Sequence, residues 1–311
     1  MSMKKCCVIG SINVDLVITL PRFHLGGETI AGSGFGVFPG GKGGNQAVAL
    51  GRLGAQVAMV GGIGADANGG MYLDVLKREG VDAQMIRRFD DETTGVALIE
   101  VEGASGENRI VINAGANARV DRSYIDRVWD RLMTYDLFLL QFEIPEDAVK
   151  YAAARLRKAG KTVILDPAPA PRGRLDPDFL RCIDYITPNE TELSALTGMK
   201  VGTKEQILAA ALELRRQGAR AVIAKMGAAG AMLVDGEGAH PIEGFRVDAV
   251  DTTAAGDSFN AGFAYALAEG RTPLDAVRYA NAVGALATTK LGAQSGMPTR
   301  AQADQLMTAA S

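Results

Sequence analysis

The residues best suited to chemistry lie within residues 251–260, where the small residues Ala254, Ala255 and Gly256 precede Asp257. We expect a strand to end just before this turn and a helix to begin in it, because apolar residues follow at helical spacing without a proline. Uncovered amides at a helix N-terminus bind anions, phosphate above all. An aspartate repels an anion unless it has its own task, such as accepting a proton from a hydroxyl group that attacks phosphorus. The stretch alone leaves open that Asp257 is merely the N-cap of an ordinary helix.

A second glycine-rich turn, with the sequence GGKGGN, spans residues 40–45 and leads into a helix that we expect to run through Leu53. Such a turn can hold an anion or a polar ligand on its backbone amides. It is not a P-loop, because neither serine nor threonine follows Lys42. A flexible turn without a ligand remains the alternative.

Asn189 and Glu192 stand three positions apart, so they would share one face of a helix. Amide and carboxylate oxygens with retained water suit Mg²⁺. The same pair also fits a capping box, which would only close the end of the helix. No GxGxxG motif follows the first expected strand, so a redox cofactor is not indicated. Two glycine-rich turns, a carboxylate beside one of them and a pair suited to Mg²⁺ together favour phosphoryl transfer from a nucleotide.

Composition narrows the classes of function. The chain has 311 residues, is 47% hydrophobic and carries a formal net charge of −3 without acidic or basic blocks, so neither nucleic acid nor a membrane surface is indicated as a partner. Three cysteines and two histidines show no spacing typical of a metal site or disulfide framework. No stretch approaches the roughly 20 apolar residues of a membrane span, and we expect a cytoplasmic protein.

Segments with the character of strands alternate with helical segments along most of the chain, which predicts an α/β fold with a mostly parallel central sheet and helices on both faces. Residues 1–311 should form a single domain. Residues of about 14–39 and 93–114 alternate instead like strands of a small separate sheet, which could serve as a lid. Polar residues recur where the expected strands end, and parallel strands would bring them to one edge. These residues are Asn13, Asp15, Glu143, Asp166, Asn189, Glu192, Asp251 and Asp257.

Seven motifs together resemble the ribokinase/PfkB family of carbohydrate kinases. They are GSINVD at 10–15, GGKGGNQA at 40–47, TTGVALI at 93–99, NAGAN at 113–117, DPAPA at 166–170, TPNETE at 187–192 and DTTAAGDSFN at 251–260. The resemblance extends from Gly10 to Pro298, almost the whole chain. The AAGD form of the last motif is similar to that of the ribokinase branch of the family. A ribokinase-like fold with a β-sheet lid is therefore implied.

The resemblance also implies roles for individual residues. Asp257 would be the base that takes the proton of the 5-hydroxyl of D-ribose, and Ala254, Ala255 and Gly256 would form the anion hole. The implied sugar ligands are Asn13, Asp15, Gly41, Lys42, Asn45 and Glu143. The implied ATP site comprises Asn189, Lys225, Gly227, Gly230, Gly256 and Asn281, with Glu192 ordering Mg²⁺ through water. A monovalent cation, K⁺, would be surrounded by Asp251, Thr253, Ala287, Lys290, Gly292 and Gly296.

Family members of this branch are K⁺-activated and dimerise through their lids, which implies a homodimer here. Three residues depart from the pattern of the family: Asp166 stands where asparagine is usual, Lys225 where threonine is expected, and Gly296 where serine is expected. None of the three is an implied sugar ligand, so ribose remains the expected substrate. A sibling kinase for deoxyribose, fructose or a nucleoside is the first alternative, and a non-catalytic sugar-binding regulator is the second.

Overall fold

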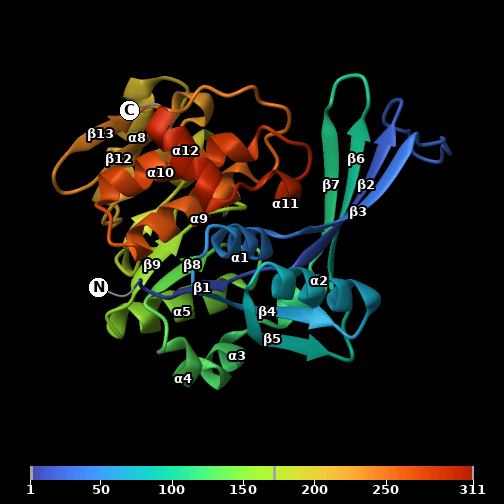
Figure 1. Cartoon of the computed structure of the whole chain (residues 1–311), viewed down its shortest axis with the longest axis horizontal. Coiled ribbons are helices and arrows are strands. Elements are labelled where there is room, and N and C mark those ends of the chain that lie inside the picture. The colour runs from blue at the N-terminus through green and yellow to red at the C-terminus, as the bar shows by residue number, and fades with distance from the viewer. Residues whose placement is uncertain (1–2, 171–172, 310–311) are drawn as a thin grey trace.

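A large central sheet organises the computed structural model, which describes residues 3–170 and 173–309 (Figure 1). Within those residues it has nine strands, seven of which run parallel in the unbroken series from β11 to β5. β12 and β13 add to one edge in antiparallel pairs. In their spatial order the strands are β13 (Ala239–Ile242), β12 (Ala231–Val234), β11 (Val222–Lys225), β10 (Tyr185–Ile186), β9 (Thr162–Leu165), β8 (Leu137–Leu140), β1 (Cys6–Ile9), β4 (Val57–Gly64) and β5 (Asp82–Phe89). The predicted mostly parallel sheet is confirmed.

Helices cover both faces of this sheet, as the alternation of side chains along β1 shows. Cys6 and Val8 belong to one buried apolar cluster, whereas Cys7 and Ile9 belong to another. The first cluster is completed by α1 (Lys42–Arg52), α2 (Ala67–Arg78), α9 (Ala255–Ala268), α10 (Pro273–Ala287) and α12 (Arg300–Ala309). The second is completed by α3 (Arg122–Arg127), α4 (Trp129–Leu132), α5 (Glu146–Lys158), α6 (Pro177–Leu180), α7 (Glu190–Thr197) and α8 (Lys204–Arg216). The prediction of helices on both faces is therefore confirmed.

A second, smaller sheet projects from the main body (Figure 1). Its order is β3 (Gly34–Gly40), β2 (Asn13–Leu20), β6 (Gly95–Glu102) and β7 (Asn108–Asn113). β2 and β6 are parallel, while the two outer pairs are antiparallel. Val37, Leu16, Leu98 and Val111 lie side by side across the four strands, so they share one face. Val37, Leu98 and Val111 are 47%, 51% and 66% exposed, which leaves an apolar row open to solvent.

The structure differs from the sequence-based prediction at the edge strands β5 and β13 and just before Asp251. The edge strands β5 and β13 were not predicted: β5 carries several charged residues, and β13 contains Pro241, which weakens the strand pattern but is tolerated at a sheet edge. The strand expected just before Asp251 is absent from the described residues. Instead the amides of Val250 and Asp251 both donate to the carbonyl of Thr288, at the end of α10.

The remaining elements are short. η1 (Gly115–Arg119) follows β7, η2 (Gly227–Ala229) follows β11, and α11 (Ala293–Gly296) lies between α10 and α12. None of the helices in the described ranges is long and apolar enough to cross a bilayer.

Candidate active site

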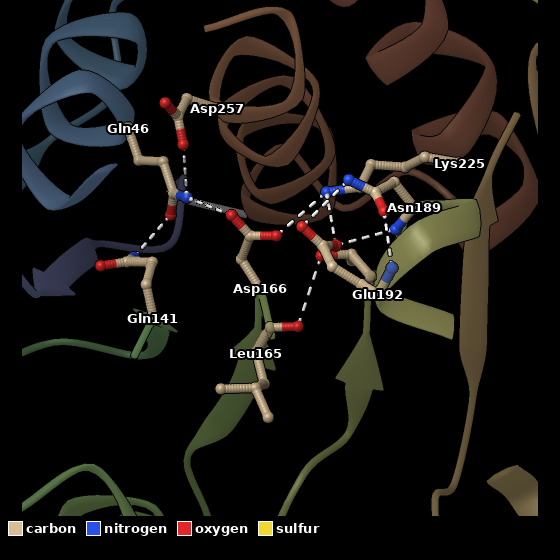
Figure 2. Close-up of polar contacts among 9 residues, drawn as sticks. Gln46, Gln141, Leu165, Asp166, Asn189, Glu192, Lys225 and Asp257 are labelled. Carbon is tan, nitrogen blue, oxygen red and sulfur yellow. Dashed lines mark hydrogen bonds and ion pairs between the residues drawn. The ribbon is translucent and has the colours of Figure 1, made fainter. Parts of the chain in front are cut away.

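Five neighbouring parallel strands of the large sheet end at the same edge. Asn13 lies beyond β1, Glu143 beyond β8, Asp166 directly after β9 and Asn189 beyond β10, while Lys225 is the last residue of β11. The convergence expected from the sequence is thus present in the structure. The N-terminal ends of α1 and α9 meet over this edge, because Asn45 and Gln46 of α1 both contact Asp257 of α9. Figure 2 shows Gln46 beside Asp257.

The start of α9 differs from an ordinary capped helix. Its N-cap is Ala254, which adopts a left-handed conformation with φ of 57° and has no side-chain cap. Asp257 is the third helical residue, so the interpretation of Asp257 as the N-cap is wrong. Within the described chain, the amides of Gly256 and Asp257 have no acceptor, whereas the amide of Ala255 donates to the carbonyl of Thr252 at 3.2 Å. The free amides of this turn therefore face whatever ligand enters.

Asp257 is 5% exposed, and both oxygens of its carboxylate accept hydrogen bonds. Asn45 Nδ2 donates to Oδ2 at 3.1 Å, and Gln46 Nε2 donates to Oδ1 at 3.1 Å. Burial raises the pKa of Asp257 to about 6, the nearby Lys42 opposes this shift, and the charge of Asp166 adds to it. A carboxylate with such a pKa is ionised at neutral pH and still basic enough to take a proton.

The predicted sugar ligands lie near the start of β2, where the small sheet begins. Asn13 Oδ1 accepts a hydrogen bond from Asn117 Nδ2 at 2.8 Å, which fixes the Asn13 amide. Glu143 Oε2 accepts from Ser11 Oγ at 2.5 Å and from the amide of Lys42 at 2.9 Å. Burial raises the pKa of Asp15 to about 6, and the charges of Glu143 and Asp257 add to the shift. The structure therefore brings these predicted ligands to one side of Asp257.

Gly41 and Lys42 join this group at the start of α1. Gly41 has a φ of 82°, and a Cβ atom built there would lie 2.7 Å from the amide nitrogen of Asn13. Only glycine fits a backbone that passes so close to β2. Burial disfavours the Lys42 ammonium, but the carboxylates of Asp257, Asp166, Glu143 and Glu192 more than offset this and raise its pKa. Lys42 is therefore a positive charge set among acids.

A polar cavity of about 450 Å³ lies between α7, β11 and the start of α9. We refer to it as the polar cavity; its lining includes Lys42, Asp166, Asn189, Glu192, Lys225 and Asp257. Lys225 Nζ forms an ion pair with Asp166 Oδ1 at 3.0 Å and lies 4.0 Å from Glu192 Oε2. Burial raises the pKa of Glu192, whereas the charge of Lys225 lowers it.

The capping box expected as one alternative for Asn189 and Glu192 is present. Asn189 Oδ1 accepts from the amide of Glu192 at 2.8 Å, and Glu192 Oε2 accepts from the amide of Asn189 at 2.8 Å. Glu192 Oε1 also accepts from Asn189 Nδ2 at 3.0 Å. Both carboxylate oxygens are thus engaged, which fits a divalent cation held through water better than one bound directly. Among the described residues, no group of three or more acidic, histidine or cysteine side chains could hold a metal ion.

A larger, mainly apolar cavity of about 560 Å³ adjoins the polar cavity, and we refer to it as the apolar cavity. Of the predicted nucleotide ligands, Lys225, Gly227, Gly230, Gly256 and Asn281 line it, whereas Asn189 lines only the polar cavity. Lys225, Gly227, Thr252 and Gly256 line both cavities, so the two meet at these residues. A flat apolar group in one cavity could therefore extend an anionic chain into the other.

The residues predicted to surround a monovalent cation are brought together behind the α9 turn. Asp251 Oδ1 accepts from the amide and the hydroxyl of Thr253, and Asp251 Oδ2 accepts from the amide of Gly292 at 2.8 Å. Despite partial burial, these hydrogen bonds lower the pKa of Asp251. A Cβ atom built on Gly296 would lie 2.4 Å from the carbonyl oxygen of Ala287 and 3.4 Å from that of Lys290. Serine in place of Gly296 would therefore require this loop to shift.

Two residues that contact the predicted site, Gln46 and Gln294, had no role predicted from the sequence. Gln46 bridges Asp257 and Asp166, and Gln294 Nε2 donates to Asn45 Oδ1 at 3.2 Å. The signal for Gln46 was its position directly after Asn45 within the GGKGGNQA motif. Gln294 falls within the stretch of family resemblance, but its spacing alone indicated no partner.

Comparisons with known proteins identify the family of this chain. Residues 3–300 match the family described as pfkB family carbohydrate kinase. A ribokinase from Haemophilus influenzae is 41% identical over 297 residues, which cover 96% of each chain. A ribokinase from Bacillus subtilis is 39% identical over 98% of this chain and 100% of its own. The solved structure of Arabidopsis thaliana ribokinase complexed with ribose and ATP has a TM-score of 0.92 at 34% identity and covers 99% of both chains. The chain belongs to the pfkB family of carbohydrate kinases.

Proposed function

We propose that this protein is an ATP-dependent kinase that transfers the γ-phosphoryl group of ATP to the 5-hydroxyl of D-ribose, giving ribose 5-phosphate and ADP. The observation that carries the proposal is the buried Asp257 carboxylate beside the free amides of its own helix terminus, between sugar-side residues and the polar cavity. The likeness to ribokinases, one of which is solved with ribose and ATP, supports both substrates.

In the proposed reaction the 5-oxygen of the sugar attacks the γ-phosphorus while its proton passes to Asp257. The bond between the γ-phosphorus and the bridging oxygen breaks, and its electron pair leaves on ADP. The amides of Gly256 and Asp257, with Ala254 and Ala255 shaping the turn, stabilise the charge on the transferred group. Asn45 and Gln46 hold both oxygens of Asp257, which fixes the base before substrate arrives.

The residues on the sugar side would bind the other hydroxyl groups. A polyol needs several fixed donors and acceptors, and carboxylates, amides and one ammonium supply them. We assign this task to Asn13, Asp15, Gly41, Lys42, Asn45 and Glu143. The small sheet, built from residues of about 14–39 and 93–114, would close over the sugar and keep water from competing as the acceptor.

We assign the adenosine part of ATP to the apolar cavity, with Gly227, Gly230, Gly256 and Asn281 in its wall, and the phosphates to the polar cavity, with Asn189 and Lys225. Mg²⁺ bound with ATP supplies positive charge against the phosphates, and Glu192 would order it through water. Carbonyl and carboxylate oxygens around Asp251 suit K⁺, and the other residues of this assignment are Thr253, Ala287, Lys290, Gly292 and Gly296. A cation there would act on the α9 turn from behind.

We further propose a homodimer that forms through the small sheet, in the cytoplasm where ATP is supplied. The exposed apolar row of Val37, Leu16, Leu98 and Val111 favours this arrangement, because monomeric proteins rarely leave contiguous apolar surface uncovered. A second copy would cover the row with a surface of the same kind.

The test is ADP release by the purified protein with a panel of pentoses, deoxyribose, hexoses and nucleosides. The proposal expects the highest kcat/KM with ribose and a product phosphorylated at the 5-position. A higher value for deoxyribose, fructose or a nucleoside would identify a sibling kinase. Sugar binding without sugar-dependent turnover would identify a non-catalytic sugar-binding protein and refute the proposal.

A further inference from the structure

A line of polar contacts joins Asp257 to Lys225 across the wall of the polar cavity (Figure 2). Gln46 Nε2 lies 3.1 Å from Asp257 Oδ1 and 3.0 Å from Asp166 Oδ2. The other oxygen of Asp166 pairs with Lys225 Nζ at 3.0 Å. Asp257 and Asp166 are 5% and 3% exposed, and the Lys225 side chain is 12% exposed, so bulk water scarcely screens these contacts. Asp166 and Lys225, two of the departures from the family pattern, are therefore direct partners.

The Gln46 amide can adopt one orientation here. Its oxygen accepts a hydrogen bond from Gln141 Nε2 at 2.6 Å, and its nitrogen offers one hydrogen to each carboxylate. Rotating the amide by half a turn would set Gln46 Oε1 against two carboxylate oxygens and Gln46 Nε2 against another amide nitrogen. Gln46 thus fixes the position of Asp257 relative to Asp166 without carrying a charge.

Lys225 has hydrogen-bonding capacity left for a ligand. An ammonium group donates three hydrogen bonds, and Asp166 accepts one of them. Glu192 Oε2, at 4.0 Å, is close enough for charge attraction but too far for a hydrogen bond. Lys225 also lines both cavities, at the place where a phosphate chain would pass from the apolar cavity toward Asp257. Its ammonium can therefore meet a phosphate oxygen without leaving Asp166.

We propose that Asp166 and Gln46 are positioning residues that hold two working groups of the site together: Asp166 fixes Lys225 against the phosphates of the nucleotide, and Gln46 fixes Asp257 against Asp166. The inference rests on the proposed function. It gives Asp166 a task, because a buried carboxylate without a cation would repel the phosphates. It also makes Asp166 and Lys225 one unit, since removing either partner of a buried ion pair leaves an uncompensated charge.

The first experiment compares the native protein with Lys225→Met, Asp166→Asn and the double variant. ATP binding is measured by calorimetry without sugar and without divalent cation, so the result does not depend on turnover. We expect Lys225→Met alone to weaken ATP binding about 10- to 100-fold, the usual effect of losing a charge-assisted hydrogen bond. In the Asp166→Asn background the same substitution should cost less than about 5-fold, because Lys225 is no longer held in place and its loss no longer leaves the Asp166 charge unpaired against the phosphates.

An equal cost of Lys225→Met in both backgrounds, or a larger cost in the Asp166→Asn background, would overturn the proposal. Lys150→Met is the matched control, because it removes an exposed ion pair with Glu146 on α5 and should leave ATP binding unchanged. If the native protein releases no ADP with any sugar, the proposed function fails, while this binding comparison still decides whether Asp166 positions Lys225.

The second experiment tests the link to Asp257 through Gln46→Ala. We expect kcat to fall about 10- to 100-fold while ribose and ATP binding change less than about 3-fold, because Gln46 acts on the base rather than on either substrate. The pH at which kcat/KM falls should move up in Gln46→Ala and down in Asp166→Asn, since the first loses a hydrogen bond to the carboxylate of Asp257 and the second loses a neighbouring negative charge. Shifts in the same direction, or no shift in either variant, would refute positioning through Gln46.

Discussion

Lowering the pH should stop catalysis well before it harms the fold, because the proposed base is a buried carboxylate. The pKa of Asp257 is raised from 3.8 to about 6, so about one tenth of the molecules would have an ionised base at pH 5. An aspartate with its ordinary pKa would be more than about nine tenths ionised at that pH. We therefore expect kcat/KM to fall about tenfold for each pH unit below 6.

The steepness with which kcat/KM falls per pH unit shows how many groups must be ionised. Asp15 also has a pKa raised to about 6, and its carboxylate lies on the sugar side. If ribose binding needs Asp15 ionised, kcat/KM falls about a hundredfold per unit, because two protons must be absent at once. The charges acting on Asp257 are the ammonium of Lys42, which lowers its pKa, and the carboxylate of Asp166, which raises it. The charge of Asp257 in turn raises the pKa of Asp15. Lys42→Met should therefore move the fall in activity to higher pH.

As the pH falls, the contribution of Asp257 to folding stability should rise while activity falls. A folded pKa above the unfolded value means that the folded state binds more protons between about pH 4 and 6. Ionised Asp257 thus costs stability as the pH rises through this range, by about 3 kcal/mol for a pKa raised from 3.8 to about 6. Protonation of this group at pH 5 relieves that cost, so lost activity should not reflect unfolding through Asp257.

The assay is direct chromatographic measurement of ADP from pH 4.5 to 8, which avoids coupling enzymes with pH limits of their own. Thermal melting at each pH shows that the protein remains folded, and return to pH 7.5 should restore full activity. Undiminished kcat/KM at pH 5 in folded protein would refute the assignment of a raised pKa to the base.

Four further outcomes follow from the described contacts. Asp257→Asn should lower kcat about 10²–10⁴-fold, the usual contribution of a general base, with little effect on folding by circular dichroism; unchanged turnover would contradict the base assignment. Gly41→Ala should destabilise the fold by about 1–3 kcal/mol in urea titration, since its φ of 82° and the nearby Asn13 amide exclude a side chain. Activity should be higher in KCl than in NaCl at equal ionic strength, and equal rates would argue against the cation site. Leu98→Glu should yield monomers in light scattering at a concentration where the native protein is dimeric.

The position of the site could be predicted because the sheet is parallel. At β1, β8, β9 and β10 a buried apolar run followed by polar residues indicates a strand with polar side chains after its carboxyl end. Parallel pairing brings these four ends to one edge of the sheet, whatever the details of packing. The boundary before Asp251 could not be predicted in this way. The two amides there bond to the carbonyl of Thr288, at the end of a helix almost 40 residues away in sequence, and no local pattern announces such a contact.

Contacts between side chains could likewise not be predicted from the sequence. Asp166 and Lys225 were each recognised as unusual, yet they are 59 positions apart and only the pairing of β9, β10 and β11 brings them within 3.0 Å. Gln46 is an uncharged polar residue in a helix, and glutamine is mostly found at protein surfaces. Its role depends on three partners from α9, the end of β9 and the end of β8, which only the folded chain assembles.

The distribution of charge explains how so acidic a site can accept an anion. Asp15 and Glu143 lie on the side proposed for the sugar, where an uncharged polyol needs acceptors, while Lys225 and the free amides of α9 face the polar cavity. Asp257 stands at the border, where the hydroxyl group becomes a phosphate ester. Asp166 and Glu192 are acids on the phosphate side. Asn189 donates to both carboxylate oxygens of Glu192, and the ion pair of Asp166 with Lys225 offsets the charge of Asp166. Substitutions in that pair should therefore disturb nucleotide binding before they disturb sugar binding, whereas substitutions of Asp15 or Glu143 should do the reverse.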